Sequence, residues 1–220
     1  MSMSPADISL ILNILGVVSF SISGVLVAAR KKMDYLGVVI LGIVSSVGGG
    51  VIRDIIMGRI PPTMFTNPLY VTVSFVTSNI AFFYLYFNLD GKSRPAINRI
   101  FEEVYFWFDT FGLALFTTQG VVAGKTMSGA GLFLCSFLGV ITGVGGGVLR
   151  DILADTVPAI FIKHIYALAS IIGALVISLL WDVNDTLAML AGSILIIQIR
   201  YMARKHKWNL PIIKNAPVEH

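Results

Sequence analysis

The sequence predicts an all-α integral membrane protein, with seven transmembrane helices arranged as two inverted three-helix repeats plus a seventh helix. Three observations support this prediction. The composition is far more apolar than that of a soluble domain, seven apolar stretches are long enough to cross a bilayer, and one heptapeptide occurs twice. We expect the whole chain, residues 1–220, to form a single membrane domain.

The composition places the chain in a membrane. Hydrophobic residues make up 56% of it and charged residues only 13%, against roughly 25% charged residues in soluble domains. Mean hydropathy is +0.84. The net charge of +4 would suit a nucleic-acid-binding protein, but the basic residues gather in short loops and the C-terminal tail, as membrane topology requires. No nucleic-acid partner is therefore expected.

Seven stretches have the length of a membrane span. A helix needs about 20 mostly apolar residues to cross a bilayer, and glycine, proline and charged residues separate the stretches here. The expected spans cover residues 8–29, 36–57, 67–88, 103–123, 131–154, 162–181 and 185–201. A basic tail, residues 202–220, follows the last span and is expected to bind anionic lipid headgroups.

The distribution of lysine and arginine predicts the orientation. Seven spans put the N-terminus and the C-terminal tail on opposite sides of the membrane. The side of the tail holds twelve basic residues: Arg30, Lys31, Lys32, Lys92, Arg94, Arg99, Lys163, Arg200, Arg204, Lys205, Lys207 and Lys214. The side of the N-terminus holds only Arg59 and Lys125. Positively charged loops face the cytoplasm, so the N-terminus is expected outside and the C-terminus inside.

A repeated heptapeptide marks an internal duplication. The sequence Gly48-Gly49-Gly50-Val51-Ile52-Arg53-Asp54 returns, nearly unchanged, as Gly145-Gly146-Gly147-Val148-Leu149-Arg150-Asp151. Upstream, Ser21-Ile22-Ser23-Gly24-Val25 corresponds to Thr117-Thr118-Gln119-Gly120-Val121. The repeats therefore span about 8–88 and 103–181, with an appended helix over 185–201. Three spans per repeat is an odd number, so the second repeat must be inverted relative to the first.

The glycine triplets have two interpretations. Glycine destabilises a helix interior by about 1 kcal/mol relative to alanine, so the triplets are expected to interrupt spans 36–57 and 131–154 and to face a shared central cavity. On this interpretation Gly146→Leu obstructs a pathway more than it disturbs folding. The alternative is close packing, because small residues let membrane helices approach each other.

The charged pairs that follow the triplets are expected at opposite mouths of a shared pathway. Charged groups inside a membrane mark pathways more often than structure. Arg53 and Arg150 are expected to be neutralised by carboxylates or carbonyls, or to act as movable gates; the alternative is that they snorkel to the interface. Asp54 and Asp151 lie about 100° around the helix from their neighbouring arginines, so the two members of a pair are not expected to share a partner.

Polar residues in other spans are weaker candidates for the pathway. Ser19, Ser21 and Ser23 match Thr117, Thr118 and Gln119 in the second repeat. Asp109 is assigned to the interface. No catalytic or metal-binding pattern occurs: there is no nucleophile beside a base and no cluster with ligand spacing. We expect neither an enzyme nor a cofactor.

Two inverted three-span units, each with Gly-Gly-Gly-x-x-Arg-Asp in its second span, plus a seventh span, resemble the prokaryotic trimeric intracellular cation (TRIC) channels. The resemblance implies a homotrimer in the inner membrane with one pore per protomer, selective for monovalent cations, chiefly potassium, and gated at glycine-kinked helices. The implied pore and gating residues are Ser45, Gly48, Gly49, Gly50, Arg53, Asp54, Thr142, Gly145, Gly146, Gly147, Arg150 and Asp151.

Two other functions stay open at this point. Interrupted inverted helices also serve secondary transporters, and some relatives of the resembled family are proposed carriers of a small amino acid such as glycine. A non-transporting scaffold explains the spans but not the two Arg-Asp pairs. The Lys-Glu-Val motif of the animal members, associated with phosphoinositide lipid, is not evident in this sequence.

Overall fold

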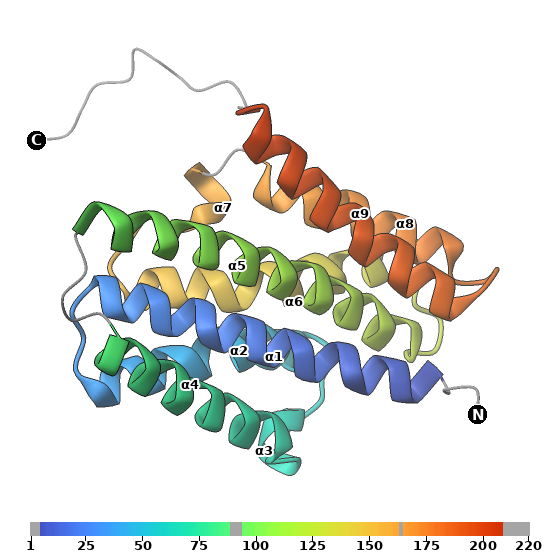
Figure 1. Cartoon of the computed structure of the whole chain (residues 1–220). Helices are drawn as coiled ribbons and strands as arrows, with labels where there is room; N and C mark the ends of the chain where they lie inside the picture. The colour runs from blue at the N-terminus through green and yellow to red at the C-terminus, as the bar shows by residue number, and fades with distance from the viewer. Residues whose placement is uncertain (1–4, 89–93, 163–164, 209–220) are drawn as a thin grey trace, which may run out of the picture.

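A computed structural model describes residues 5–88, 94–162 and 165–208, and every regular element in these ranges is helical (Figure 1). Seven helices are long: α1 (Pro5–Arg30), α2 (Tyr35–Ile56), α4 (Leu69–Asn88), α5 (Arg94–Lys125), α6 (Leu132–Leu153), α8 (Tyr166–Leu180) and α9 (Asp185–Lys205). Two are single turns, α3 (Thr63–Thr66) and α7 (Ala159–Ile162).

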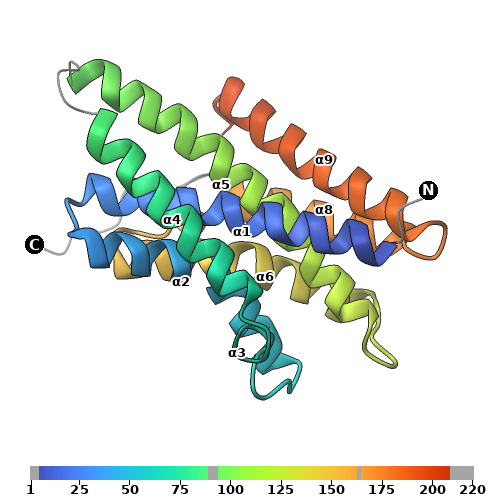
Figure 2. The same cartoon turned by 60° about the horizontal axis from the view of Figure 1, so that its bottom comes forward.

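Four helices form the centre of the bundle. α1 and α5 run antiparallel side by side (Figure 1), and α2 and α6 pack against them and against each other. α4 packs across α1 and α2, as Figure 2 shows, and α8 packs across α5 and α6. α9 lies against α8 and α5. Phe20, Leu113, Phe116 and Tyr166 fill the middle of this arrangement.

The seven expected spans coincide with the seven long helices, with shifted ends. α5 starts at Arg94 rather than 103, because a proline such as Pro95 is tolerated in the first turn of a helix. α8 starts at Tyr166 rather than 162, and α7 precedes it. α9 continues to Lys205, so the first residues of the expected tail are helical.

Five of the described helices are long and apolar enough to cross a membrane, namely α1, α2, α4, α6 and α9. α8 is apolar but has only 15 residues, fewer than the roughly 20 that a perpendicular span needs. α4 is the most peripheral, since only 11% of its apolar window is buried. Its outward side chains include Phe83, Tyr84 and Phe87, as suits a surface that faces lipid or another protein.

Matching hydrogen bonds join helices in both halves of the chain. Ser21 on α1 and Ser74 on α4 are joined by a bond of 2.7 Å. Thr117 on α5 and Ser170 on α8 are joined by a bond of the same length. All four side chains are fully buried. The serines and threonines expected to line a pathway at these positions instead connect helices, a common use of hydroxyls in membrane bundles.

Candidate functional site

The two glycine triplets bring α2 and α6 into direct backbone contact. A Cβ atom at Gly49 would overlap the carbonyl oxygen of Thr142, and one at Gly146 would overlap the carbonyl oxygen of Ser45. Glycine is therefore required at both positions by close approach. The contact is reciprocal, because each helix presents a glycine to the other helix's carbonyl.

The expected interruption of these helices is wrong. α2 is helical without a break from Tyr35 to Ile56, and α6 from Leu132 to Leu153. Close packing, the alternative interpretation, explains the triplets, because helix–helix contact compensates the low helix propensity of glycine. The expected effect of Gly146→Leu is corrected for the same reason: a side chain there would push the helices apart.

Beyond the triplets, each arginine binds the aspartate that follows it. Nε and Nη2 of Arg53 donate to Oδ1 of Asp54 at 2.9 and 2.8 Å. In α6, Nε of Arg150 donates to Oδ1 of Asp151 at 2.8 Å. This contact lies within each pair and is not a case of both members binding one third partner, the arrangement that was not expected. Arginine is long enough to fold back onto the adjacent carboxylate.

The second oxygen of each aspartate binds the backbone of a short helix. Oδ2 of Asp54 accepts from the amide of Thr63, the first residue of α3, at 2.9 Å. Oδ2 of Asp151 accepts from the amide of Ala159, the first residue of α7, at 2.8 Å. First-turn amides of a helix lack intrahelical partners. Each aspartate therefore joins an arginine to the loop that follows its own helix.

The two arginines differ sharply in their surroundings. The side chain of Arg53 is 13% exposed, whereas that of Arg150 is 0% exposed. Nη1 of Arg150 donates to Ser23 Oγ at 2.6 Å and to Asp109 Oδ1 at 2.8 Å. Nη2 donates to the hydroxyl of Tyr105 at 2.9 Å. Arg150 is thus neutralised and enclosed, not snorkelling to the interface.

Asp109 and Arg200 complete this buried cluster, and both expectations for them were wrong. Asp109 was assigned to the interface but is fully buried. Arg200 was counted with the tail but lies in α9, and its Nη2 donates to Asp109 Oδ2 at 3.1 Å. Arg200 also stacks on the rings of Tyr166 and Phe106, at 4.6 and 5.2 Å from their centres. Asp109 therefore bridges two arginines.

Without Arg200, the count of basic residues on the side predicted to be cytoplasmic falls from twelve to eleven. The opposite side still has two, Arg59 and Lys125. Lys92, Lys163 and Lys214 lie outside the described residues, as does most of the basic tail, residues 209–220. Arg204, which was also counted with the tail, lies in the last turn of α9 and forms an exposed ion pair with Glu103.

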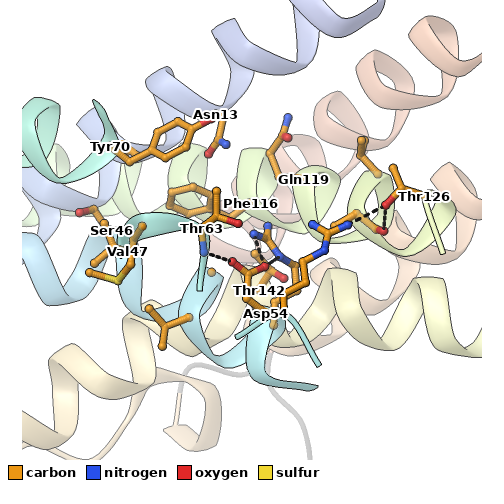
Figure 3. A pocket seen from close by; sticks show the side chains of 18 residues that line it. Asn13, Ser46, Val47, Asp54, Thr63, Tyr70, Phe116, Gln119, Thr126 and Thr142 are labelled. Carbon is orange, nitrogen blue, oxygen red and sulfur yellow. Dashed lines mark hydrogen bonds and ion pairs between the residues drawn. The ribbon is translucent and has the colours of Figure 1, made fainter. Parts of the chain in front are cut away.

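A cavity of about 240 Å³ opens at the Arg53 end of the molecule (Figure 3). Five long helices and α3 supply its lining, with Asn13 from α1, Tyr70 from α4 and Gln119 from α5 on one side of the view, and Asp54 and Thr142 on the other. Nε2 of Gln119 donates to the backbone oxygen of Ser9 at 3.0 Å, which fixes the side-chain amide. The other polar lining residues are Ser46, Arg53, Arg59, Thr63 and Thr126.

Two further cavities lie at the opposite end, around the Arg150 cluster. One, of about 430 Å³, lies between α5 and α9 and is lined by Tyr105, Arg200 and Arg204 among others. The other, of about 200 Å³, reaches Asp151 and Tyr105 from the ends of α1 and α7. The Arg150 side chain is fully buried behind these cavities and binds Tyr105 and Asp151, which line them.

The predicted site residues fall into three groups. Gly50, Arg53, Asp54 and Thr142 line the cavity at the Arg53 end. Arg150 and Asp151 form the buried cluster at the other end. Gly147 adjoins that cluster, because it faces Tyr166 and Arg150. The remaining five form the contact between α2 and α6: Ser45, Gly48, Gly49, Gly145 and Gly146. The hydroxyl of Ser45 is buried without a hydrogen-bond partner among the described residues.

Sequence reasoning missed Asp109, Arg200, Tyr105 and Asn13. A signal was present for the first two, because each is an ionised side chain within a helical apolar pattern, which by itself predicts an internal partner. Tyr105 and Asn13 carry no such signal. No group of three or more potential metal ligands occurs among the described residues.

These features can be compared with known proteins. A family model described as Glycine transporter matches residues 10–86 and, a second time, residues 106–182. The UPF0126 inner membrane protein YadS of Escherichia coli K12 is 36% identical over 203 residues, covering 91% of this chain and 93% of the relative. The TRIC trimeric intracellular cation channel orthologue from Rhodobacter sphaeroides is 32% identical, with a TM-score of 0.81 over 91% of this chain and 99% of that one. The chain belongs to the prokaryotic TRIC channel family.

A second TRIC structure, solved to explain conductance through TRIC cation channels, has a TM-score of 0.78 at 32% identity, over 94% of this chain and 98% of that one. The sequence-based assignment to the TRIC family is thereby confirmed, and the chain is a multi-pass membrane protein. Each of the two segments matched by the family model contains one of the Arg-Asp pairs. The matched segments begin 96 residues apart, the spacing that also separates Ser21 from Thr117.

Proposed function

We propose that this TRIC family member is a monovalent cation channel, chiefly for potassium, with one pathway through each protomer of a homotrimer. The pathway enters at the cavity beside Arg53 and continues between α1, α2, α5 and α6 toward the cluster around Arg150. The observation that carries the proposal is this polar cavity, lined by the four central helices together with α3 and α4 in a fold shared with TRIC cation channels.

In this proposal the described conformation is closed at the Arg150 end. An unneutralised arginine would repel a cation by about 4 kcal/mol at 4 Å and an effective dielectric constant near 20. Arg150 is neutralised here by Asp109 and Asp151, and its buried side chain joins α6 to Ser23 on α1 and Asp109 on α5. Conduction therefore requires the Arg150 side chain to leave its present partners.

We further propose seven membrane spans in two inverted repeats, with the N-terminus outside and the C-terminus in the cytoplasm. Two observations support the repeat: the equivalent hydrogen bonds in the two halves, and one family model that matches both halves of the chain. The eleven basic residues on the side of the C-terminus support the orientation. The Arg53 cavity then faces outward, and the Arg150 cluster faces the cytoplasm.

A second candidate is a carrier of a small amino acid such as glycine. The description of the family model favours it, and so does the cavity itself. An arginine beside amide and hydroxyl groups, in about 240 Å³, is chemically suited to a carboxylate-bearing zwitterion. A channel and a carrier differ in whether flux saturates and whether glycine itself crosses.

Flux into liposomes separates the two candidates. Purified protein is reconstituted, and potassium flux and uptake of labelled glycine are measured on the same vesicles. We expect potassium flux that does not saturate at low millimolar concentration, with no accumulation of glycine. Saturable glycine uptake without potassium flux would establish the carrier instead.

Two variants test the gate. In planar bilayers, Arg150→Ala is expected to raise open probability or change rectification, because the charged side chain that joins α6 to α1 and α5 is lost. Asp151→Asn is expected to lower the preference for cations over anions. Lys205→Ala, at an exposed position near the end of α9 that lines none of the three cavities, is the matched control and should leave both properties unchanged. Unaltered gating in Arg150→Ala would reduce that arginine to a structural role.

A further inference from the structure

We propose that the cavity at the Arg53 end binds a small monovalent anion, of the size of acetate or chloride, between the guanidinium of Arg53 and the amide of Asn13. The site lies in the cavity at which the proposed cation pathway begins. The inference does not require that the protein conduct. The inference rests on comparing the two ends of the molecule, where equivalent arginines have different partners.

At the Arg150 end the protein supplies its own anion to the arginine. Nη1 of Arg150 is 2.8 Å from Asp109 Oδ1, and both side chains are fully buried. Tyr166 donates its hydroxyl to the same oxygen at 3.3 Å. The carboxylate of Asp109 therefore sits between an arginine Nη1 and a tyrosine hydroxyl.

The equivalent position at the Arg53 end carries no charge. The matching hydrogen bonds show that Ser21 corresponds to Thr117 and that Ser74 corresponds to Ser170. Corresponding residues in the two halves are therefore 96 positions apart. The same spacing relates Asn13 to Asp109 and Tyr70 to Tyr166. Asn13 and Tyr70 both line the cavity and lie on the same side of it in Figure 3. The tyrosine is thus retained, and the carboxylate is replaced by an amide.

Arg53 consequently has an unused donor in the cavity. Its Nε and Nη2 bind Asp54, while Nη1 donates to no residue in the described ranges. The side-chain amide of Asn13 also makes no hydrogen bond to any described residue. The Arg53 side chain is only 13% exposed, and a charged donor with so little access to water binds an anion strongly.

The charge of the cavity favours an anion from solution. Its lining includes two arginines, Arg53 and Arg59, and one carboxylate, Asp54. Arg59 is anchored by Thr126, whose hydroxyl oxygen accepts from its Nη2 at 3.0 Å, so its remaining donors are available. A carboxylate or halide placed beside Arg53 and Asn13 would take the role that Asp109 has at the other end. The volume of about 240 Å³ accommodates a small anion such as acetate or chloride.

Thermal unfolding of the purified full-length protein in detergent tests this site. Sodium acetate or sodium chloride is titrated at constant ionic strength, with the bulky sulfonate HEPES as the replacing anion. We expect a saturable rise of the unfolding midpoint, because a ligand that binds only the folded state stabilises it. A rise with acetate alone identifies a carboxylate site, and a rise with both salts identifies a general site for small anions.

Asn13→Asp is the decisive variant, since it builds the missing carboxylate into the protein. It should abolish the saturable response. Asn88→Asp makes the same change of charge at an exposed position at the end of α4 and should keep the response. If Asn13→Asp does not fold, Asn13→Leu is used, which removes the donor and should also abolish the response. No saturable shift in the unmodified protein, or an equal shift after either substitution of Asn13, would overturn the proposal.

These measurements involve no flux, so their failure leaves the proposed channel function untouched. Conversely, a protein that binds acetate but conducts no potassium would contradict the channel and keep the anion site.

Discussion

Arg150 and Asp109 are joined by an ion pair of 2.8 Å, and neither side chain is exposed. The pair connects α6 to α5, and Asp109 extends the connection to α9 through Arg200. Two arginines and two aspartates, including Asp151, make the cluster neutral. A neutral and fully hydrogen-bonded cluster is the condition under which buried charges are tolerated.

The first prediction concerns this neutrality. Asp109→Asn leaves the cluster with one excess positive charge and should destabilise the protein by about 3–5 kcal/mol, the range for breaking a buried pair. Adding Arg200→Gln restores neutrality. The double variant should therefore be more stable than the sum of the single effects predicts, by at least about 1 kcal/mol. Unfolding in detergent measures this, and strictly additive effects would show that the two residues are not coupled.

The second prediction concerns the hydroxyl of Tyr105. Tyr105→Phe removes an acceptor for Nη2 of Arg150 and keeps the ring over which the guanidinium lies, 5.2 Å from its centre. Stability should fall by about 1 kcal/mol, and open probability in planar bilayers should rise because Arg150 is held less firmly. Tyr35→Phe is the control, since that hydroxyl bonds Asn79 in an exposed position. Equal gating in both variants would contradict a role of Tyr105 in closure.

The third prediction compares the stability effects of alanine at two glycines of the triplets, Gly146 and Gly50. Gly146→Ala should destabilise the protein by about 1–3 kcal/mol, because its Cβ meets the carbonyl oxygen of Ser45 and the backbone must move. Gly50→Ala should be neutral or stabilising, because the nearest atom, Nη2 of Arg53, is 3.8 Å from the new Cβ and alanine favours a helix. Thermal unfolding of both variants provides the comparison. A greater loss with Gly50→Ala would contradict the packing role of the triplets.

The fourth prediction concerns topology. In a protein whose native Cys135 is replaced, a cysteine at Lys32 should react with an impermeant reagent from the cytoplasmic side, and one at Lys125 from the outside. Lys32 ends the turn after α1, and Lys125 ends α5. Labelling of both from the same side would overturn the inverted arrangement of the repeats.

Much of the fold follows from the sequence, because a membrane span depends on local composition. All seven expected spans meet a long helix, and the repeat is visible from residues such as Gly49 and Gly146. The helix ends were less predictable: α5 begins nine residues before position 103, since its first turns carry charged residues that a hydropathy argument assigns to a loop.

The site was predicted only where it lies within the repeated motif. Arg53, Asp54, Arg150 and Asp151 could be found because they recur. Asp109 and Arg200 could not be paired from sequence, because their contact joins residues 91 positions apart on different helices. The glycines were assigned the wrong role for a related reason. Local propensity predicts a break at three glycines, but close packing against the facing helix stabilises the continuous form.

The position of the contact between α2 and α6 has a mechanical consequence. Arg53 and Arg150 each lie four residues, or about 6 Å along the helix, beyond the glycine at which the helices touch. With so short a lever arm, a helix tilt of ~10° about the glycines displaces either arginine's backbone by only about 1 Å. Large swings of α2 and α6 are therefore an inefficient way to move the charges. Reorientation of the long arginine side chains covers several times that distance with the helices in place.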